Sequence, residues 1–189
     1  MSNDDITAGF HLKRAVVLVG MMGSGKTAIG KSLAVRLNVP FLDSDAAIEE
    51  AAQLSISEIF ERDGEPFFRK REAEVISRLI KAQVCVLSTG GGAFMSPAVR
   101  DTIAEHGVAL WLDADIDLLW ERVRHKDTRP LLRTPNPRQT LADIYETRLP
   151  IYALAGLRTQ VQPNKTIDET TDQVLRTLGG APHVLEPLP

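Results

Sequence analysis

Cysteine and long apolar runs are what this sequence has least of. Its 189 residues include one cysteine, Cys85, so no disulfide framework can hold the fold together. Cys85 stands in the short apolar run 84–87, which predicts a buried core residue. No apolar stretch approaches the roughly 20 residues that span a membrane, and the acidic start at residues 1–5 is unlike a signal peptide. We therefore expect a cytoplasmic protein without a membrane partner.

The chain also lacks an excess of positive charge. Lysine and arginine number 22 against 25 aspartate and glutamate, a net charge of −3 with histidine neutral. Nucleic acid is therefore disfavoured as the main partner, although a local basic pocket is compatible with this balance. Hydrophobic residues make up 43% and charged residues 25%, as in globular proteins that bury a continuous core. We expect one domain and, by default, a monomer.

Short apolar runs alternate with helical patterns along most of the chain. The runs that predict strands are 15–19, 40–42, 84–87, 108–112 and about 158–161. The helical patterns lie near 25–38, 46–62, 66–82, 97–106, 115–125, 137–155 and 169–178. This alternation implies right-handed crossovers and a parallel sheet covered on both faces. The prediction is an α/β fold, a three-layer α/β/α sandwich with about five parallel strands over residues 14–178.

Three segments interrupt this rhythm. Segment 124–139 holds three prolines and four arginines. It fits either a solvated surface loop or a mobile lid that brings positive charge over a phosphate. The N-terminal extension at 1–13 and the tail at 179–189, with two glycines and three prolines, are expected to fray.

The strongest motif is the run GMMGSGKT at residues 20–27. It fits the phosphate-loop (P-loop) pattern G-x-x-x-x-G-K-[ST] at every fixed position. It follows the predicted strand 15–19 and precedes the helical pattern 28–37, the order that a P-loop requires. A plain glycine-rich turn would explain the glycines, but it has no need for the lysine and threonine. The sequence therefore predicts a nucleotide phosphate site.

Each residue type in this loop has a physical task. Glycine lets the backbone adopt positive φ and approach a phosphate, and the exposed N–H groups at the helix start face the anion. Lys26 supplies a charge to the β and γ oxygens, and the Thr27 hydroxyl is the expected Mg²⁺ ligand. GTP is disfavoured because no Asn-Lys-x-Asp motif is present. The residues expected to bind ATP here are Gly23, Ser24, Gly25, Lys26, Thr27 and Ala28.

Two carboxylates, Asp43 and Asp45, follow the predicted strand that ends at residue 42. Ligands of parallel sheets bind at the carboxyl ends of the strands, so one aspartate could serve the metal shell and the other an acceptor hydroxyl. An aspartate at this point also suits the N-cap of the following helix. One of the two could be a cap, or both roles could coexist.

Three consecutive glycines, Gly90, Gly91 and Gly92, follow the third predicted strand. They would let a ligand lie against bare backbone, and three glycines cost more chain entropy than an ordinary turn requires. Arg69 and Arg148 each stand within an apolar helical pattern. Most helix arginines are solvated surface residues, and spacing alone does not separate that interpretation from a binding role.

With these motifs in order, the chain resembles the shikimate kinase family over roughly residues 14–178. The later motifs are weak one by one and specific in this order and spacing. The triple glycine and the Arg-Pro-Leu-Leu string distinguish the chain from gluconate kinases and nucleoside monophosphate kinases. The matching positions after the P-loop are Asp43-Ser44-Asp45, Asp63-Gly64-Glu65-x-x-Phe68-Arg69, Gly90-Gly91-Gly92, Arg129-Pro130-Leu131-Leu132 and Arg148-x-x-x-Tyr152.

The resemblance implies a nucleoside monophosphate kinase type of fold, with a lid at about 124–139. It implies ATP- and Mg²⁺-dependent phosphorylation of the 3-hydroxyl of shikimate, toward chorismate and aromatic amino acids. Arg129 would be the lid arginine on ATP, and Thr27 would ligate Mg²⁺ with Asp43 nearby. The implied shikimate-binding residues are Asp45, Arg69, Gly91 and Arg148. The implied catalytic residues are Lys26, Asp45 and Arg129.

Two other functions stay open at this point. One is a kinase for another small polyol acid, such as gluconate. The other is a nucleotide-binding regulatory switch whose slow ATPase gates a partner. Many members of the family carry a basic residue near the adenine after the last strand, where this chain reads QPNK at 162–165.

Overall fold

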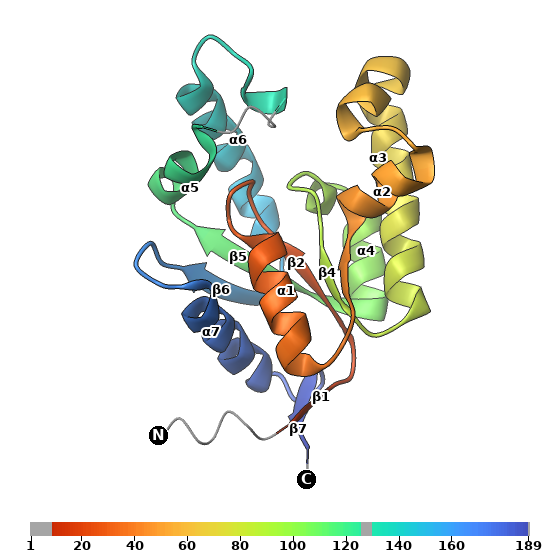
Figure 1. Cartoon of the computed structure of the whole chain (residues 1–189), viewed down its shortest axis with the longest axis vertical. Coiled ribbons are helices and arrows are strands. Elements are labelled where there is room, and N and C mark those ends of the chain that lie inside the picture. Colours follow the sequence, from red (N-terminus) through yellow and green to blue (C-terminus); the bar gives the residue numbers. More distant parts are fainter. Residues whose placement is uncertain (1–8, 126–129, 189) are drawn as a thin grey trace.

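The computed structural model describes residues 9–125 and 130–188. Its centre is a five-stranded parallel sheet of order β3-β4-β2-β5-β6, and the predicted α/β fold class is confirmed (Figure 1). The strands are β2 (Ala15–Val19), β3 (Phe41–Asp43), β4 (Val86–Ser88), β5 (Gly107–Ala114) and β6 (Leu157–Val161). Central β2 pairs its Val17 with Leu87 of β4 and Ala109 of β5. Because the strands are parallel, the loops that follow them gather at one edge of the sheet.

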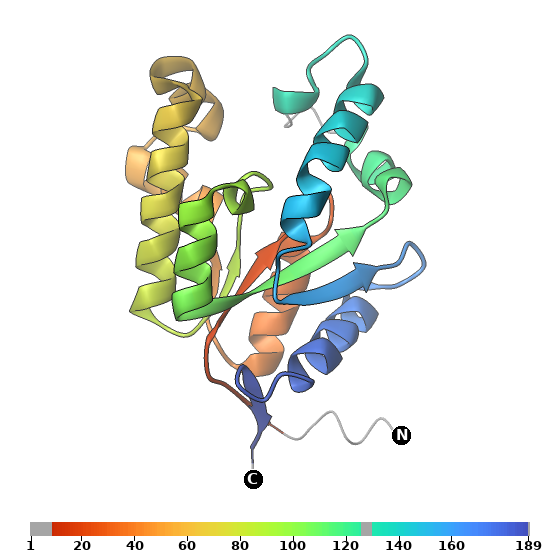
Figure 2. The same ribbon diagram turned by 180° about the vertical axis from the view of Figure 1, so that it is seen from behind.

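Helices cover both faces of the sheet, which gives the predicted three layers (Figures 1 and 2). The helices are α1 (Lys26–Leu37), α2 (Ser44–Ala52), α3 (Ile56–Ala82), α4 (Pro97–His106), α5 (Ile116–Val123), α6 (Pro137–Tyr152) and α7 (Ile167–Gly179). Helices α1 and α7 pack together on one face, and α3 and α4 pack together on the other. No helix of the described part of the chain is long and apolar enough to cross a membrane.

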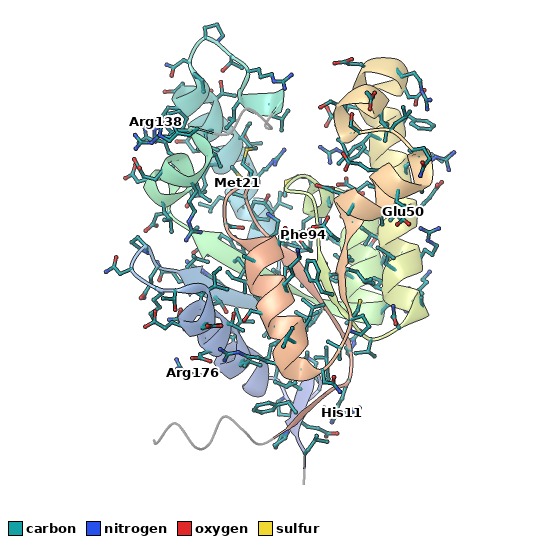
Figure 3. The ribbon with its side chains drawn as sticks, in the orientation of Figure 1. His11, Met21, Glu50, Phe94, Arg138 and Arg176 are labelled. Atoms are coloured by element: carbon teal, nitrogen blue, oxygen red, sulfur yellow. The ribbon has the colours of Figure 1, made fainter. Side chains whose placement is uncertain are left out.

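Two flanks rise beyond the carboxyl ends of the strands. One consists of α2 with α3 and the other of α5 with α6. Figure 3 shows Glu50 on the first flank, Arg138 on the second, and Met21 between them. The two flanks therefore combine helices that are far apart in the sequence.

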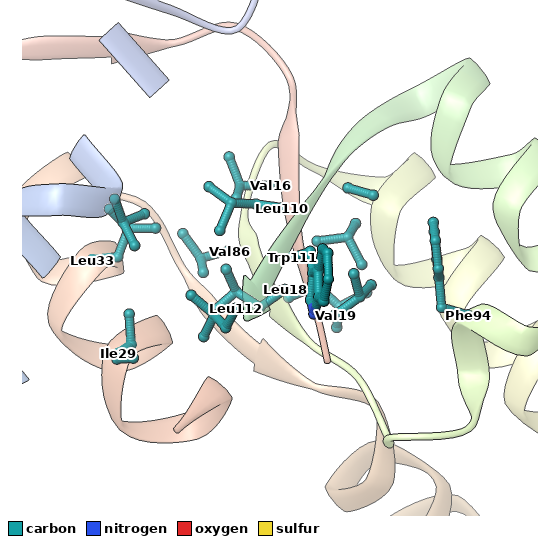
Figure 4. Close-up of a cluster of buried hydrophobic side chains, with 14 of the residues drawn as sticks. Val16, Leu18, Val19, Ile29, Leu33, Val86, Phe94, Leu110, Trp111 and Leu112 are labelled. Atoms are coloured by element: carbon teal, nitrogen blue, oxygen red, sulfur yellow. The ribbon is translucent and has the colours of Figure 1, made fainter. Parts of the chain in front are cut away.

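The core lies on both faces of the sheet. Every residue of β2 is buried, and Leu18, Leu110 and Leu112 have no exposed surface (Figure 4). Strands covered on both faces read as continuous apolar runs, which is why these strands were recognisable in the sequence. Cys85 is buried as predicted, and burial raises the pKa of its thiol to about 11. Truncating one buried leucine of such a core to alanine typically costs about 2–5 kcal/mol.

The predicted division between the helical patterns 46–62 and 66–82 coincides with the kink at Gly64 inside α3, but the patterns miss an earlier break. The break between α2 and α3 falls earlier, where Gln53 has a positive φ of 54° and Ser55 forms a capping box with Glu58. Helix α3 then runs to Ala82, with a kink at Gly64, whose φ is 81° and ψ 167°. The non-helical backbone of Gly64, followed by Pro66, divides this long helix into two helical segments.

The expectation of frayed ends is wrong for the residues that the structure describes there. Strand β1 (Phe10–Leu12) pairs antiparallel with β7 (Leu185–Pro187), which joins the two ends of the chain (Figure 1). Lys13 Nζ lies 2.5 Å from a carboxylate oxygen of Glu186, and Leu185 is 2% exposed. Each segment is only three residues long, which is too short for a strand pattern to stand out, so the pairing could not be read from either one.

Segment 124–139 falls partly outside the described residues. Residues 126–129, and with them the predicted lid residue Arg129, are not described. After them come the 3-10 turn η3 (Pro130–Leu132) and α6, whose N-cap Asn136 accepts a hydrogen bond from the N–H of Gln139. Arg138 at the start of α6 pairs with Asp117 of α5 at 2.7 Å. The lid role of this segment stays a prediction.

Candidate active site

The P-loop has the geometry that its sequence predicts. It joins β2 to α1, and Gly20, Gly23 and Gly25 have positive φ of 142°, 83° and 97°. A Cβ at residue 20 would lie 2.7 Å from the carbonyl oxygen of Leu112. Other residues rarely adopt these conformations, so this backbone path requires glycine. The first hydrogen bond of α1 is donated by Ile29 to Gly25, so the amides before Ile29 lie at the anion-binding end of the helix.

The side chain of Lys26 lies within the loop. Its Nζ donates hydrogen bonds to the carbonyl oxygens of Gly20 at 2.8 Å and Met21 at 2.9 Å, and the residue is 9% exposed. The sequence interpretation had placed this side chain in a ligand site rather than in the core. In this structure it also holds the loop together, which gives Lys26 a local structural role besides any contact with phosphate.

Thr27 and Asp43 meet beside the P-loop. Thr27 Oγ1 lies 3.4 Å from Asp43 Oδ2. The other oxygen of the same carboxylate, Oδ1, accepts the N–H groups of Asp45 at 3.0 Å and Ala46 at 3.3 Å and so caps α2. The two interpretations of Asp43 are therefore compatible, because each uses a different oxygen.

A cavity of about 520 Å³ joins the P-loop to the other loops at this edge of the sheet. Its volume is in the usual range for small-molecule sites. Its walls bring the P-loop together with both aspartates and the glycine loop, defined here as Gly90, Gly91 and Gly92. The lining residues include Gly23, Gly25, Lys26, Thr27, Ala28, Asp43, Asp45, Gly90, Gly91, Arg122, Lys165 and Thr166. Ser24 of the P-loop is fully buried beside this wall.

The glycine loop is packed closely by acidic and basic side chains. A Cβ at residue 90 would lie 2.8 Å from Asp45 Oδ1 and 2.9 Å from Glu72 Oε1. A Cβ at residue 92 would lie 2.6 Å from Arg69 Nη2. Any larger residue here would push against these groups, so the glycines give them room to approach the backbone.

The hydrogen bonds of this loop leave its donors available. The carbonyls of Gly90 and Gly92 accept from the N–H groups of Ala93 at 3.1 Å and Met95 at 3.1 Å. Within residues 9–125 and 130–188, the N–H groups of the three glycines donate no hydrogen bond. Buried or half-buried N–H groups normally have partners. This loop is therefore suited to donate to oxygen atoms of a ligand.

Arg69 and Arg148 reach the glycine loop from different helices. Arg69 of α3 donates to Glu72 at 2.8 Å and to Glu65 at 3.1 Å. Burial opposes its charge, but these two carboxylates outweigh burial and raise the pKa of Arg69. Arg148 of α6 would lie 3.4 Å from a Cβ at residue 91. Both arginines are half-buried rather than freely solvated, which removes the surface interpretation of these two residues.

Glu72 belongs to this site although its sequence did not single it out. It is 1% exposed, and within the described part of the chain its Oε1 has no hydrogen-bond partner. Burial raises the pKa of Glu72, and the charge of Arg69 opposes that rise only in part. The available signal was the i,i+3 spacing from Arg69, which places both on one face of α3.

Arg122 is a second residue that the sequence interpretation missed. It lies in the last turn of α5 and donates to the carbonyl of Gly23 at 3.1 Å. Burial lowers the pKa of its guanidinium. It lines the cavity together with Lys165 and Thr166, which follow β6. A single arginine in a short helix gave no signal, because only the packing of α5 on the P-loop makes it part of the site.

The structure brings most of the predicted site residues together. The P-loop residues, Asp43, Asp45 and Gly91 border one cavity or its wall, and Arg69 and Arg148 lie against the adjoining glycine loop. A strand–P-loop–helix unit beside a second polar subsite defines the class of the protein, a P-loop phosphotransferase that acts on a small acceptor.

Comparison with known proteins identifies the branch of this class. The family model of shikimate kinase matches residues 22–179. The shikimate kinase of Ruegeria pomeroyi is 58% identical over 175 residues, which cover 93% of this chain and 90% of that protein. The one from Cereibacter sphaeroides is 57% identical over 176 residues, 93% of this chain and 88% of that protein. The chain belongs to the shikimate kinase family.

A solved structure agrees with this assignment. Shikimate kinase from Acinetobacter baumannii in complex with shikimate superposes with a TM-score of 0.81 and 35% sequence identity. The match covers 86% of this chain and 91% of that chain. The predicted family and the predicted fold are therefore confirmed.

Proposed function

We propose that this protein transfers the γ-phosphoryl group of ATP to the 3-hydroxyl of shikimate, giving shikimate 3-phosphate and ADP, in the route to chorismate and aromatic amino acids. The observation that carries the proposal is the glycine loop, whose N–H donors have no partner among the described residues and lie between the P-loop, two acidic side chains and two arginines. A hydroxylated carboxylic acid needs this combination of donors and acceptors. Membership in the family supports the same substrate.

ATP would bind with its phosphates on the P-loop. The amides at the start of α1 and the charge of Lys26 would stabilise the β- and γ-phosphates. To reach them, the ammonium would exchange its bonds to the carbonyls of Gly20 and Met21 for bonds to phosphate oxygens. The planar guanidinium of Arg122, which lines the same cavity, suits stacking against the purine base.

The residues beside the P-loop fit a magnesium ion. Thr27 Oγ1 and Asp43 Oδ2 are hard oxygen donors 3.4 Å apart, and Mg²⁺ prefers such donors while keeping several waters. Residues 9–125 and 130–188 contain no group of three His, Cys, Asp or Glu that could hold a metal alone. We therefore propose that Thr27 and Asp43 receive Mg²⁺ together with ATP. When bound, the ion would neutralise charge on the phosphates.

Shikimate would bind along the glycine loop. Arg69 and Arg148 would pair its carboxylate, because the planar fork of arginine matches a carboxylate bidentately. Asp45 would accept a hydrogen bond from the reacting hydroxyl, hold it in line with the γ-phosphate and take its proton as the bond to phosphorus forms. Gly91 would donate its N–H to a ring hydroxyl.

Arg129 completes the proposed machinery as a lid arginine on ATP, although it lies outside the described residues. Its charge would stabilise the transferring phosphoryl group, and closure would exclude water that otherwise hydrolyses ATP. Arg129→Ala should therefore lower kcat more than it weakens shikimate binding. Equal binding affinity measured by calorimetry, with reduced turnover, is the expected pair of results.

ADP release measured against a panel of acceptors tests the function. The panel is shikimate, gluconate and water alone, each with Mg²⁺ and ATP. We expect rapid ADP release with shikimate only. A preference for gluconate would assign a different polyol acid, and ADP release independent of any acceptor would indicate a nucleotide switch. Either result would overturn the proposal.

We also propose that the enzyme acts as a cytoplasmic monomer on small molecules, without nucleic acid or membrane. The described residues of the proposed site all lie in one chain and already border one cavity, which supports a site within a single copy. Its phosphoryl donor, ATP, is a cytoplasmic metabolite. Light scattering that gives a mass near 20.8 kDa, unchanged by ATP and shikimate, would support the monomer.

A further inference from the structure

The carbonyl of Gly91 is bound differently from its neighbours in the glycine loop. The carbonyls of Gly90 and Gly92 accept backbone N–H groups three residues ahead. The carbonyl of Gly91 instead accepts the phenolic hydroxyl of Tyr152, which is 61 residues away at the end of α6. This tertiary contact fixes the orientation of the peptide plane between Gly91 and Gly92, within a turn made of three glycines.

Tyr152 is held rigidly for this task. It is 1% exposed, and its ring stacks on Trp111 of β5 with ring centres 6.1 Å apart and planes at 21°. Its position is therefore set by the central sheet as well as by α6. Burial raises the pKa of the hydroxyl to about 12, against the smaller opposite effect of the nearby Arg148. The group stays protonated at neutral pH, so it can donate its proton to the carbonyl of Gly91.

A peptide plane has its C=O and its N–H on opposite sides. A carbonyl of Gly91 that is turned toward Tyr152 turns the N–H of Gly92 the other way. Without the hydroxyl, the plane could rotate at low cost, because glycine has few steric limits. The N–H of Gly92 would then lose this orientation.

We propose that Tyr152 is a positioning residue for the acceptor substrate: its hydroxyl holds the Gly91 carbonyl and so fixes the orientation of the Gly92 N–H, which we assign to an oxygen of shikimate. Tyr152 does not touch the substrate in this scheme. It acts through the backbone, and it links α6, which carries Arg148, to the glycine loop. The inference rests on the proposed function, because it takes shikimate as the acceptor.

Tyr152→Phe is the central test, because it keeps the ring and its stacking and removes only the hydroxyl. We expect the KM for shikimate to rise about five- to twentyfold, the range for losing one well-placed hydrogen bond. The KM for ATP should stay within about twofold, since the P-loop is untouched. Tyr145→Phe is the matched control, because Tyr145 lies two turns earlier on α6 and is half-buried. It should leave both KM values unchanged.

A carboxamide analogue of shikimate separates two routes by which Tyr152 could act. If the hydroxyl acts through the glycine-loop amides, Tyr152→Phe should penalise kcat/KM for the acid and the amide by the same factor. If it acts through Arg148 instead, the acid should lose much more than the amide. That second result would overturn the proposal, as would equal KM values for Tyr152→Phe and Tyr145→Phe.

Amide resonances of ¹⁵N-glycine-labelled wild type keep the idea testable even if Tyr152→Phe folds poorly. The signals of the glycine loop should shift when shikimate is added. Absence of any shift in an active wild type would contradict the proposal. A wild type with no activity on shikimate would instead refute the proposed function, so the two failures are distinguishable.

Discussion

The two ends of the site are built in different ways. The nucleotide end is one continuous stretch, residues 20–27. Three glycines with positive φ determine the backbone path of this stretch. The acceptor end combines α2, α3, the glycine loop and α6, which are spread over about a hundred residues. A local motif therefore predicts the first end, whereas the second exists only once the sheet has brought these elements to one edge.

The difference extends to electrostatics. Lys26 donates hydrogen bonds within the loop, to the carbonyls of Gly20 and Met21. At the acceptor end, Arg69 and Glu72 form an ion pair in which the side chain of Glu72 is 2% exposed, and burial still raises the pKa of Glu72. At the acceptor end, the charged form of Glu72 is therefore disfavoured by burial, and a charged, hydroxylated ligand could offset this cost with new hydrogen bonds.

Lys26→Met, at the nucleotide end, should give the largest loss of turnover among these variants. Turnover should fall by about three orders of magnitude or more, because charge clamps on a transferring phosphoryl group have values of this size. Steady-state kinetics measures the loss. Because Lys26 also bonds the loop carbonyls, melting temperature should be recorded alongside.

Lys31→Met is the control for that change, since Lys31 is an exposed residue on the same helix. It should keep wild-type turnover. Retention of more than about a tenth of wild-type turnover by Lys26→Met would contradict the assigned role.

Arg148→Lys should disable the acceptor end and leave the nucleotide end intact. Lysine keeps the charge and loses the bidentate fork, so the loss in kcat/KM for shikimate should correspond to about 2–5 kcal/mol, with the KM for ATP unchanged. The uncharged carboxamide analogue should lose much less than shikimate. The measurement is kcat/KM for both substrates with both enzymes.

Arg176→Lys, at an exposed position on α7, is the matched control and should behave as wild type. If Arg148→Lys penalises acid and amide equally, Arg148 is structural. The substrate assignment would then lose its main physical support.

Leu185→Ala should lower the stability of the protein without changing the binding of either substrate. Leu185 of β7 is 2% exposed and lies in the pairing that joins the chain termini, remote from the P-loop and the glycine loop. Its truncation should lower the free energy of unfolding by about 2–5 kcal/mol. Urea denaturation measures this loss, and both KM values should stay unchanged at temperatures where the variant is folded. Leu188→Ala, at an exposed position, should cost little.

Glu72→Gln should give the smallest effect, seen as a change in the pH dependence of stability. The pKa of Glu72 is raised in the folded protein from its ordinary 4.5. The folded state therefore binds this proton more tightly than the unfolded state, and protonation of Glu72 increases the free energy of unfolding. That contribution is full below 4.5 and is lost as pH rises through the raised pKa. Glutamine does not titrate, so the variant should gain stability relative to wild type across this window.

Urea unfolding at a series of pH values from about 4 to about 8 measures that difference. Glu74→Gln, at an exposed position on the same helix, provides the baseline. A difference between Glu72→Gln and wild type that does not vary with pH would show that burial of this carboxyl has no energetic consequence.

The sequence by itself determined the α/β fold class, the five strands and the P-loop. Central strands such as β2 are apolar throughout because both of their faces are covered, and the P-loop glycines specify their own backbone. That an aspartate caps α2 was also readable, since an N-cap depends on neighbours two and three residues away, but only the structure shows that it is Asp43 rather than Asp45. These features share one property, that their causes lie within a few residues of chain.

Tertiary structure alone decided the burial of Glu72, the contact of Arg122 with Gly23, the bond of Tyr152 to Gly91 and the pairing of β1 with β7. The sequence interpretation missed the first two residues as site members, gave Tyr152 no physical role and expected both chain ends to fray. In each case the residues that decide the outcome are distant in sequence, as Gly90 is from Glu72, and the i,i+3 spacing of Arg69 and Glu72 does not by itself distinguish a buried glutamate from a solvated one. The hydrophobic core brings such partners together, because it fixes where each strand ends and which helix faces it.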